Sequence, residues 1–275
     1  MKRLNGAELA DYIKERQIRQ VRALRQAWKV LPKVVIVQTT DDPVISTYVR
    51  LKQAYGNDVL VDVDVRRVAQ AEVISLIGAL NADETVHGIV VQLPLESPAE
   101  TDEVLSHIAP EKDVDGLTGE GTFISATATA IDWLLAGYNV DTKNSVIAIV
   151  GEGRLVGAPL AALWRTAQYN VTTYDETTVN LGAELRKAQL IVSATGVPGL
   201  ITTDMISPGA VIVDAGTATT SAGIAGDLDP TVRERDDIVF TPARGGVGPL
   251  TIAALFDAVI LAAQRIADEK KAAQL

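Results

Sequence analysis

Tyr48 and Lys52 are the pair of side chains in this sequence best suited to proton chemistry. They stand four residues apart in a stretch predicted to be helical, so their side chains share one face of the helix. Loss of solvent or a neighbouring cation lowers the pKa of a lysine toward the range in which the amine acts as a base, and a nearby phenol can orient it and relay a proton. The alternative is a solvated lysine on an amphipathic helix, since exposed lysines are the rule.

Two further polar residues stand where α/β proteins place ligands. Gln92 ends the short apolar strand predicted over Gly88–Gln92, and the carboxyl ends of such strands face the binding crevice. Gln92 is therefore either a site residue or the start of a loop. Asp115 stands in the charged turn Lys112–Gly116, where the sequence alone favours a turn aspartate that accepts hydrogen bonds from its own backbone.

The segment Ser145–Pro159 has the pattern of the first unit of a dinucleotide-binding fold. It predicts a buried strand over Ser145–Val150 and a helix over Leu160–Gln168. Three glycines lie between them: Gly151, Gly153 and Gly157. Glycine permits a tight turn and a close approach of backbone amides to a pyrophosphate, and the helix N-terminus adds unpaired donors. The spacing is GxGxxxG and not GxGxxG, so an ordinary strand-to-helix turn remains an alternative.

Asp175 follows the next predicted strand, 24 residues after Gly151. A carboxylate there can accept hydrogen bonds from a ribose 2′-hydroxyl and repel a 2′-phosphate. Glu152 adds a second negative charge within the glycine turn. The two acids therefore predict NAD in preference to NADP. The alternative for Asp175 is a cap on the turn that continues through 176–178.

The elements that must position these residues alternate between β and α along the chain, which indicates parallel sheets covered on both faces. Helices are predicted over Glu8–Trp28, from Asp41–Pro43 onward, and over Val73–Leu80, Pro98–Ile108, Thr127–Ala136, Leu181–Ala188 and Leu250–Ile266. The remaining strands are predicted over Val34–Val37, Val59–Val65, Asn170–Tyr174, Leu190–Ala194, Ala210–Asp214 and Ile238–Phe240.

Composition narrows the class of protein. The chain has 275 residues, of which 47% are apolar, enough for two folded domains. A net charge of −10 disfavours a nucleic-acid partner. The chain has no cysteine, and only His87 and His107 could supply imidazole, so we expect no metal site. Residues 1–10 lack the apolar core of a signal peptide, and we find no apolar run of about 18 residues that would span a membrane. We therefore expect a soluble cytoplasmic protein.

Five motifs occur in an order typical of one enzyme family. They are Tyr48-Val-Arg-Leu-Lys52, Val91-Gln-Leu-Pro-Leu95, Lys112-Asp-Val-Asp-Gly116, Gly151-x-Gly-x-x-Val156-Gly157-x-Pro159 and Thr241-Pro242-x-x-Gly245-Gly-Val-Gly-Pro249-x-Thr251. Together they resemble the bifunctional methylenetetrahydrofolate dehydrogenase/methenyltetrahydrofolate cyclohydrolase family, the FolD type, over nearly the whole chain.

The resemblance implies two α/β domains flanking a cleft that holds folate, the second Rossmann-like and carrying NAD or NADP. It implies a folate-binding catalytic domain over residues 1–118 and 249–275, a dinucleotide-binding domain over 119–248, and a C-terminal helix that returns to the first domain. It also implies a homodimer that acts on tetrahydrofolate derivatives in one-carbon metabolism, with no metal.

The resemblance also assigns roles. Lys52 is the main catalytic group, Tyr48 and Gln92 position and tune it, and Asp115 holds the pterin ring. Substrate-binding residues are Tyr48, Gln92, Asp115, Pro242, Gly246 and Pro249. Cofactor-binding residues are Gly151, Glu152, Gly153, Val156, Gly157, Asp175, Thr195, Gly196, Gly216 and Arg244.

The chain departs from the family pattern mainly in its cofactor set. Glu152-Gly153 replaces the usual arginine-serine, and Asp175-Glu176 replaces the usual histidine-serine, which puts the usual NADP preference in doubt. Ser125–Ala128 replaces a proline-cysteine-threonine-proline segment. Arg244 replaces a proline, where a cation could reach a cofactor phosphate or lie against the folate. Ile45 replaces a serine before the tyrosine.

Two other functions remain open on the sequence. One is another two-domain NAD(P)-dependent dehydrogenase, of shikimate or amino-acid type, because fold does not determine function. The other is a nucleotide-binding homologue without catalysis, which the altered cofactor set favours and the complete set of Tyr48, Lys52, Gln92 and Asp115 disfavours. Short-chain dehydrogenases also have a Tyr-x-x-x-Lys pair, but their glycine turn precedes it.

Overall fold

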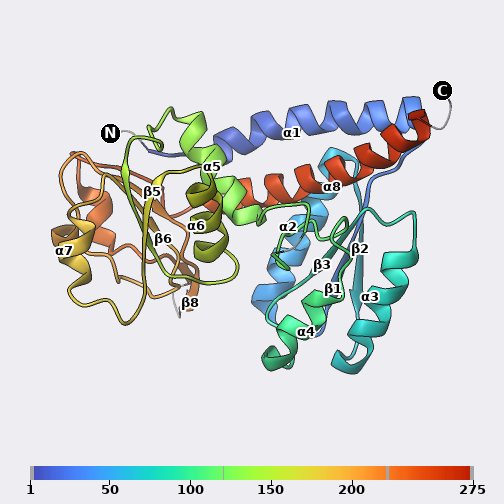
Figure 1. Cartoon of the computed structure of the whole chain (residues 1–275), viewed down its shortest axis with the longest axis horizontal. Coiled ribbons are helices and arrows are strands. Elements are labelled where there is room, and N and C mark those ends of the chain that lie inside the picture. Colours follow the sequence, from blue (N-terminus) through green and yellow to red (C-terminus); the bar gives the residue numbers. More distant parts are fainter. Residues whose placement is uncertain (1–2, 120, 221–222, 273–275) are drawn as a thin grey trace. The chain divides into compact units, whose positions relative to one another are not determined.

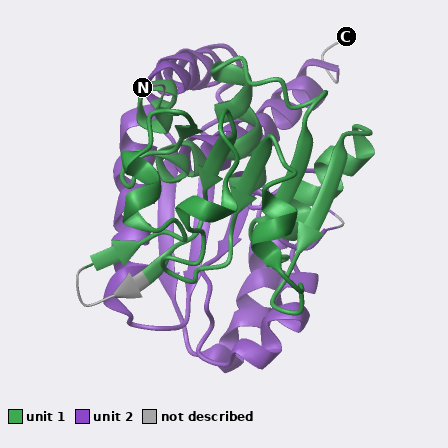
Figure 2. Ribbon diagram, turned by 90° about the vertical axis from the view of Figure 1, so that its left-hand side faces the viewer, with its two compact units in different colours: residues 1–10, 127–251 green, residues 11–126, 252–275 purple. Residues whose placement is uncertain are grey.

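The computed structural model describes residues 3–119, 121–220 and 223–272. They form two compact α/β units (Figure 2). Unit 1 comprises residues 1–10 and 127–251, and unit 2 comprises residues 11–126 and 252–275. Each unit has its own parallel sheet, so the predicted two-domain α/β class is confirmed.

The limits of the compact units differ from the expected domain limits in three short segments. Residues 1–10 and 249–251 group with the dinucleotide-binding half, and residues 119–126 group with the other half. The expected boundary at Gly119–Gly121 includes residue 120, which lies outside the described residues. The domain limits therefore stay a prediction.

Unit 2 contains a three-stranded parallel sheet in the order β2-β1-β3. Its strands are β1 (Lys33–Gln38), β2 (Asp62–Arg67) and β3 (Gly88–Val91). Its helices are α2 (Pro43–Val59), α3 (Val73–Ala82) and α4 (Thr101–Ser106), with short 3-10 turns over Gln70–Glu72 and Pro98–Glu100. All four residues of β3 are buried, as expected for an apolar strand covered on both faces.

Alternation along the strands divides the core of unit 2 between two faces. On one face Val37 and Val91 pack with Ile77 of α3 and Leu105 of α4. Gln92 comes one residue after Val91 in the chain. It is thereby directed to the other face, where its carboxamide meets Lys52 of α2.

The second predicted strand begins later than expected. We predicted a strand over Val59–Val65, but Val59 is the last residue of α2, and the strand begins at Asp62. Val59 is fully buried in the core, and Leu60 ends the helix with a left-handed φ of 64° and an amide that donates to Gly56 and Asn57. Tertiary burial of a β-branched residue in a helix explains the error, because β propensity describes fit to a half-buried surface.

Unit 1 contains a five-stranded parallel sheet in the order β10-β7-β6-β4-β5. Its strands are β4 (Val146–Val150), β5 (Asn170–Tyr174), β6 (Leu190–Ser193), β7 (Val211–Asp214) and β10 (Val239–Phe240). Its helices are α6 (Gly157–Thr166) and α7 (Leu181–Leu185), with 3-10 turns over Thr203–Met205 and Pro230–Glu234. An antiparallel hairpin of β8 (Ala218–Thr220) and β9 (Gly223–Ala225), which we did not predict, follows β7.

Three further helices complete the chain: α1 (Gly6–Ala23), α5 (Ala126–Gly137) and α8 (Val247–Ala272), visible in Figure 1. A π-helical turn over Leu24–Trp28 extends α1. Residues 252–272 of α8 belong to unit 2. There the fully buried Gln17 of α1 donates to the Ala253 carbonyl at 2.8 Å and accepts from the Tyr55 hydroxyl at 2.8 Å.

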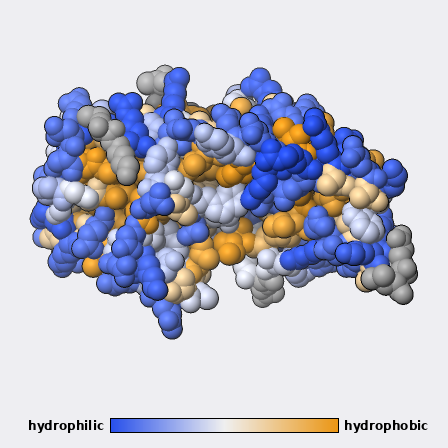
Figure 3. Space-filling view, turned by 90° about the horizontal axis from the view of Figure 1, so that it is seen from above, coloured by the Kyte–Doolittle hydropathy of each residue, from blue (hydrophilic) through white to orange (hydrophobic). Residues whose placement is uncertain are grey.

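Helix α8 is long and apolar enough, by length and composition, to cross a membrane. Our expectation that the chain has no apolar run of that length is therefore wrong. However, 61% of its most apolar window is buried inside the structure, which is typical of the core helix of a globular protein. On the face shown in Figure 3, polar side chains surround small groups of apolar ones, in accord with the charge of −10.

Candidate active site

Helix α2 positions Tyr48 and Lys52 one turn apart. Asp42 begins the helix as N-cap, its carboxylate accepting from the amides of Val44 (2.8 Å) and Ile45 (3.0 Å). An N-cap carboxylate satisfies amides that have no partner within the helix. Ile45 is buried, which secures the first turn of α2 to the core.

Gln92 receives a hydrogen bond from Lys52. The Lys52 ammonium nitrogen (Nζ) donates to Gln92 Oε1 at 2.9 Å, and Gln92 Nε2 donates to the Leu93 carbonyl at 3.1 Å. The backbone amide of Gln92 donates to the Val37 carbonyl of β1 at 2.8 Å. This hydrogen bond continues the sheet and holds Gln92 at the carboxyl edge of the sheet. Gln92 thus lies at the carboxyl edge of the sheet in contact with Lys52, and its role as a site residue stays a prediction.

The turn that carries Asp115 is organised by Asp113. Asp113 is 1% exposed and accepts from the Leu117 amide at 3.3 Å, the Thr118 amide at 2.9 Å and the Thr118 hydroxyl at 2.7 Å. Asp113 therefore accepts the backbone hydrogen bonds of the turn, which is the role that the sequence alone favoured for Asp115. Gly116 has a φ of 65°, and a Cβ there would lie 2.4 Å from the Ile124 backbone.

Burial and charge act against one another at Lys52 and Asp115. Burial lowers the pKa of Lys52, and the nearby Asp115 carboxylate opposes that shift. Burial raises the pKa of Asp115, Lys52 opposes that shift, and Asp113 adds to it. Burial also raises the pKa of Tyr48. These shifts move both Lys52 and Asp115 toward their neutral forms. A lysine must be in its neutral form to act as a base.

The glycine turn of unit 1 fits the pyrophosphate of a dinucleotide. Gly151 has a φ of 95°, and its amide donates to the Tyr174 carbonyl at 2.7 Å. A Cβ on Gly157 would lie 1.7 Å from the Gly151 carbonyl oxygen, so only glycine allows α6 to begin so close to β4. Gly153 is exposed and has no atom within 4 Å of the Cβ position, which leaves its backbone open to a ligand. Val156 precedes α6 and is partly buried.

Asp175 lies exposed at the carboxyl end of β5 and orders its own turn. Its carboxylate accepts from the Thr177 hydroxyl at 2.7 Å and the Thr177 amide at 2.9 Å, and these hydrogen bonds lower the pKa of Asp175. The cap that we considered as an alternative is thus present, and it keeps the carboxylate charged. Glu152 is also exposed.

The loops after β6 and β7 contain Thr195, Gly196 and Gly216. The Thr195 amide donates to a carboxylate oxygen of Asp227 at 2.7 Å, and Gly196 has a φ of 69°. The Gly216 amide donates to Asp214 at 3.2 Å. Neither Asp214 nor Asp227 was among the predicted site residues. A signal was present, because Asp214 ends a buried strand as Gln92 does.

The segment between β10 and α8 contains the remaining predicted residues. Pro242 is partly buried and follows the fully buried Thr241, while Gly246 is buried and Pro249 lies in the first turn of α8. Arg244 is exposed, and its role stays a prediction.

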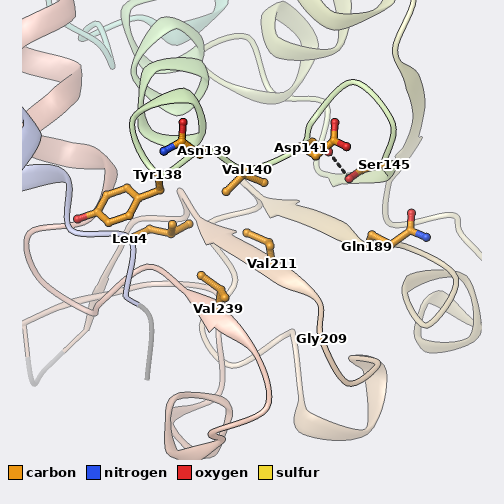
Figure 4. Close-up of a pocket in the computed structure, with 10 residues that line it drawn as sticks. All are labelled: Leu4, Tyr138, Asn139, Val140, Asp141, Ser145, Gln189, Gly209, Val211 and Val239. Carbon is orange, nitrogen blue, oxygen red and sulfur yellow. Dashed lines mark hydrogen bonds between the residues drawn. The ribbon is translucent and has the colours of Figure 1, made fainter.

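A cavity of about 300 Å³ in unit 1 (Figure 4) is lined by residues other than the predicted site residues. Its wall includes Ser145, Gln189, Val211 and Val239, which stand at or just before the first residues of β4, β6, β7 and β10. It is therefore at the amino edge of the sheet, whereas open α/β sheets bind ligands at the carboxyl edge. Among the described residues, no group of three or more His, Asp or Glu is arranged to hold a metal ion.

Comparison with known proteins covers both halves of the chain. The catalytic-domain model of the tetrahydrofolate dehydrogenase/cyclohydrolase family matches residues 4–115, and the model of its NAD(P)-binding domain matches residues 125–267. A bifunctional protein FolD from Exiguobacterium sibiricum is 34% identical over 95% of this chain and 99% of that protein.

Solved protein structures are also similar to this chain over nearly its whole length. The bifunctional enzyme FolD from Campylobacter jejuni is similar with a TM-score of 0.90 and 31% identity, over 96% of this chain and 99% of that one. A Trypanosoma brucei methylenetetrahydrofolate dehydrogenase-cyclohydrolase in complex with NADP and an inhibitor is similar with a TM-score of 0.88 and 28% identity, over 95% and 96%.

Proposed function

Since the chain belongs to the tetrahydrofolate dehydrogenase/cyclohydrolase family, we propose that it oxidises 5,10-methylenetetrahydrofolate with NAD(P)⁺. The 5,10-methenyltetrahydrofolate so formed is then hydrolysed to 10-formyltetrahydrofolate. The observation that carries the proposal is the Lys52–Gln92 hydrogen bond of 2.9 Å at the carboxyl edge of the unit 2 sheet, with Asp115 close enough to affect the lysine electrostatically. Another dehydrogenase on this fold would not require Lys52, Gln92 and Asp115 together.

Lys52 serves the hydrolytic step as the base. Water adds to the methenyl carbon that bridges N5 and N10, and its proton passes to the neutral Lys52 amine. The hydroxyl of this adduct then loses its proton as the bond from that carbon to N5 breaks, N5 takes up a proton in its place, and the formyl group stays on N10. Because burial lowers the pKa of Lys52, a larger fraction of the amine is neutral, and a neutral amine does not repel the methenyl cation.

Gln92, Tyr48 and Asp115 support that amine and the substrate. The Gln92 carboxamide accepts from Lys52 and fixes where its nitrogen lies. Tyr48, one helical turn away and held neutral by its raised pKa, orients the amine and the folate. Asp115 holds the pterin ring by accepting its N–H groups. Pro242, Gly246 and Pro249 complete the folate-binding set.

The oxidative step is chiefly a task of alignment. A nicotinamide supplies the hydride acceptor when bound. The glycine turn binds the pyrophosphate: Gly151 and Gly157 give the turn its shape, and Gly153 leaves room for the phosphates. Val156 lies in the same turn, and Thr195, Gly196 and Gly216 lie at the carboxyl edge of neighbouring strands. Arg244 contributes a cation toward a cofactor phosphate or the folate.

NAD is the preferred cofactor within this proposal. Glu152 and Asp175 are both exposed acids, and the lowered pKa of Asp175 keeps its charge at neutral pH. Two negative charges near the adenosine ribose disfavour a 2′-phosphate and leave the 2′-hydroxyl of NAD acceptable. We also propose that the enzyme is a homodimer in the cytoplasm, on the basis of its family.

A spectrophotometric assay tests the whole proposal. The purified chain is given 5,10-methylenetetrahydrofolate with NAD⁺ or NADP⁺ in separate reactions, and preformed methenyltetrahydrofolate without cofactor. We expect dinucleotide reduction, faster with NAD⁺ at equal concentration, and loss of the methenyl absorbance. A chain that performs neither reaction would refute the function, and one that prefers NADP⁺ would refute only the cofactor choice.

A further inference from the structure

Two buried aspartates join the three loops at the carboxyl edge of the unit 1 sheet. These loops follow β6, β7 and β10, three neighbouring strands of the five. Asp214 is the last residue of β7, and Asp227 follows the β8–β9 hairpin. No role is assigned to either aspartate by the motifs above.

Asp227 holds the loop after β6. It is fully buried, and its Oδ2 accepts from the Ser193 hydroxyl at 2.7 Å and from the Thr195 amide at 2.7 Å. Gly216 packs against its other oxygen, since a Cβ on Gly216 would lie 1.9 Å from Asp227 Oδ1. One carboxylate thus touches the loops after β6 and β7 together.

Asp214 extends the connection to the third loop. Its amide donates to the Thr241 hydroxyl at 2.8 Å, and Arg233 pairs with its carboxylate at 2.6 Å. The same carboxylate accepts from the Gly216 amide at 3.2 Å and from the Asp227 amide at 2.9 Å. The two aspartates together therefore link the loops that follow all three strands.

The strand order indicates which half of a dinucleotide these loops face. The order β10-β7-β6-β4-β5 reverses between β4 and β6, and dinucleotides bind across such a switch point. The glycine turn follows β4, and Asp175 follows β5, so the adenosine half belongs on that side. The loops after β6 and β7 are left for the nicotinamide half.

We propose that Asp227 is a positioning residue for the nicotinamide half of the dinucleotide, acting through the Thr195 amide and the loop at Gly216. This inference rests on the proposed NAD(P) function. Asp227 Oδ1 is buried and has no hydrogen-bond partner in the part of the chain that the structure describes. A buried, unpaired oxygen costs stability, so its presence points to a role for Asp227 besides stability. Here Asp227 Oδ1 instead packs against Gly216 in the loop after β7.

The test compares two ligands by calorimetric titration. ADP reports the adenosine–pyrophosphate half, and NAD⁺ or NADP⁺, whichever the wild type binds more tightly, reports the whole dinucleotide. We expect Asp227→Ala to weaken dinucleotide binding about tenfold or more, as for loss of a charged hydrogen bond, while ADP binding changes less than about twofold. Asp227→Asn keeps an acceptor for Thr195 and should recover binding to within about threefold of the wild type.

Asp229→Ala is the matched control. Asp229 is two residues away and accepts from the Thr231 amide at 2.9 Å in its own turn, so its loss should change neither affinity. The inference is overturned if Asp227→Ala binds the dinucleotide as the wild type does, or if it loses ADP and dinucleotide equally. Failure of the wild type to bind either ligand would instead refute the proposed function.

Hydrogen exchange on the wild type keeps the inference testable if Asp227→Ala does not fold. Peptides that cover 193–197 and 214–217 should gain protection with the dinucleotide and not with ADP, while peptides over 151–157 gain it with both. Equal protection of all three segments by ADP would overturn the inference.

Discussion

At the carboxyl edge of the unit 2 sheet the groups suited to chemistry are side chains, whereas at the same edge of the unit 1 sheet they are chiefly backbone amides. In unit 2, Lys52 has a neutral amide partner in Gln92, and its pKa is lowered by burial. In unit 1, buried carboxylates accept from amides and from Arg233 and hold glycine-rich loops in place.

The difference follows from the task of each edge. A base must exchange a proton, so its charged form cannot be strongly stabilised by its partners. A dinucleotide site must present fixed donors to a flexible ligand, so its loops are held by many hydrogen bonds. We expect mutations in unit 2 to affect chemistry and mutations in unit 1 to affect binding.

Lys52→Met should give the largest effect. Removal of the base should lower hydrolysis of methenyltetrahydrofolate by about 10²- to 10⁴-fold, with dinucleotide affinity unchanged. The measurement is the decay of the methenyl absorbance, with Lys143→Met, at an exposed loop lysine, as control. Hydrolysis at the wild-type rate would remove Lys52 from the mechanism.

Gly157→Ala should mainly impair binding. The new Cβ would lie 1.7 Å from the Gly151 carbonyl oxygen, so α6 or the glycine turn must move. We expect dinucleotide affinity to fall about tenfold or more and the melting temperature to drop by several degrees. The control is Gly78→Ala in α3, where the Cβ meets nothing within 4 Å and should stabilise by about 0.5–1 kcal/mol. An unchanged dinucleotide affinity would contradict the fit of this turn to a pyrophosphate.

Asp175→Asn should shift cofactor preference by a smaller factor. Asparagine can still accept from Thr177 and order the turn, but the charge that disfavours a 2′-phosphate is lost. The ratio of NADP⁺ to NAD⁺ affinity should rise by about threefold, as for one exposed charge. Asp236→Asn, at an exposed acid just before β10, is the control. Equal ratios in wild type and Asp175→Asn would leave Asp175 as a turn cap alone.

Asp115→Asn should produce the smallest effect of the four substitutions, a shift in the pH dependence of hydrolysis. Hydrolysis requires neutral Lys52, so kcat should rise with pH and level off above the pKa of Lys52, which lies below its ordinary value of 10.5. The Asp115 charge raises the pKa of Lys52, so its removal should move the rising limb to lower pH. A shift to higher pH would show that the two groups are not coupled as the structure indicates.

Strong local patterns predicted much of the fold. Seven predicted strands coincide with β1, β3, β4, β5, β6, β7 and β10 to within one residue at each end. They are short apolar runs with turn residues beside them, a local signal. The strand predicted over Val59–Val65 began at the wrong residue, because the tertiary burial of Val59, and not its β propensity, determines that it lies in a helix. The β8–β9 hairpin went unpredicted because it has no strong alternation of apolar and polar residues.

The sequence by itself determined the catalytic residue types, the glycine spacing and the alternation of strands and helices, because these depend on neighbours within a few positions. Only the tertiary structure decided that Lys52 meets Gln92 across 40 residues, that Asp113 and not Asp115 orders its turn, and that Asp227 reaches Thr195. The first and the last of these contacts join segments 40 and 32 residues apart in the chain. Their burial sets the pKa values and fixes the loops, and burial is a property of the folded chain that no local spacing contains.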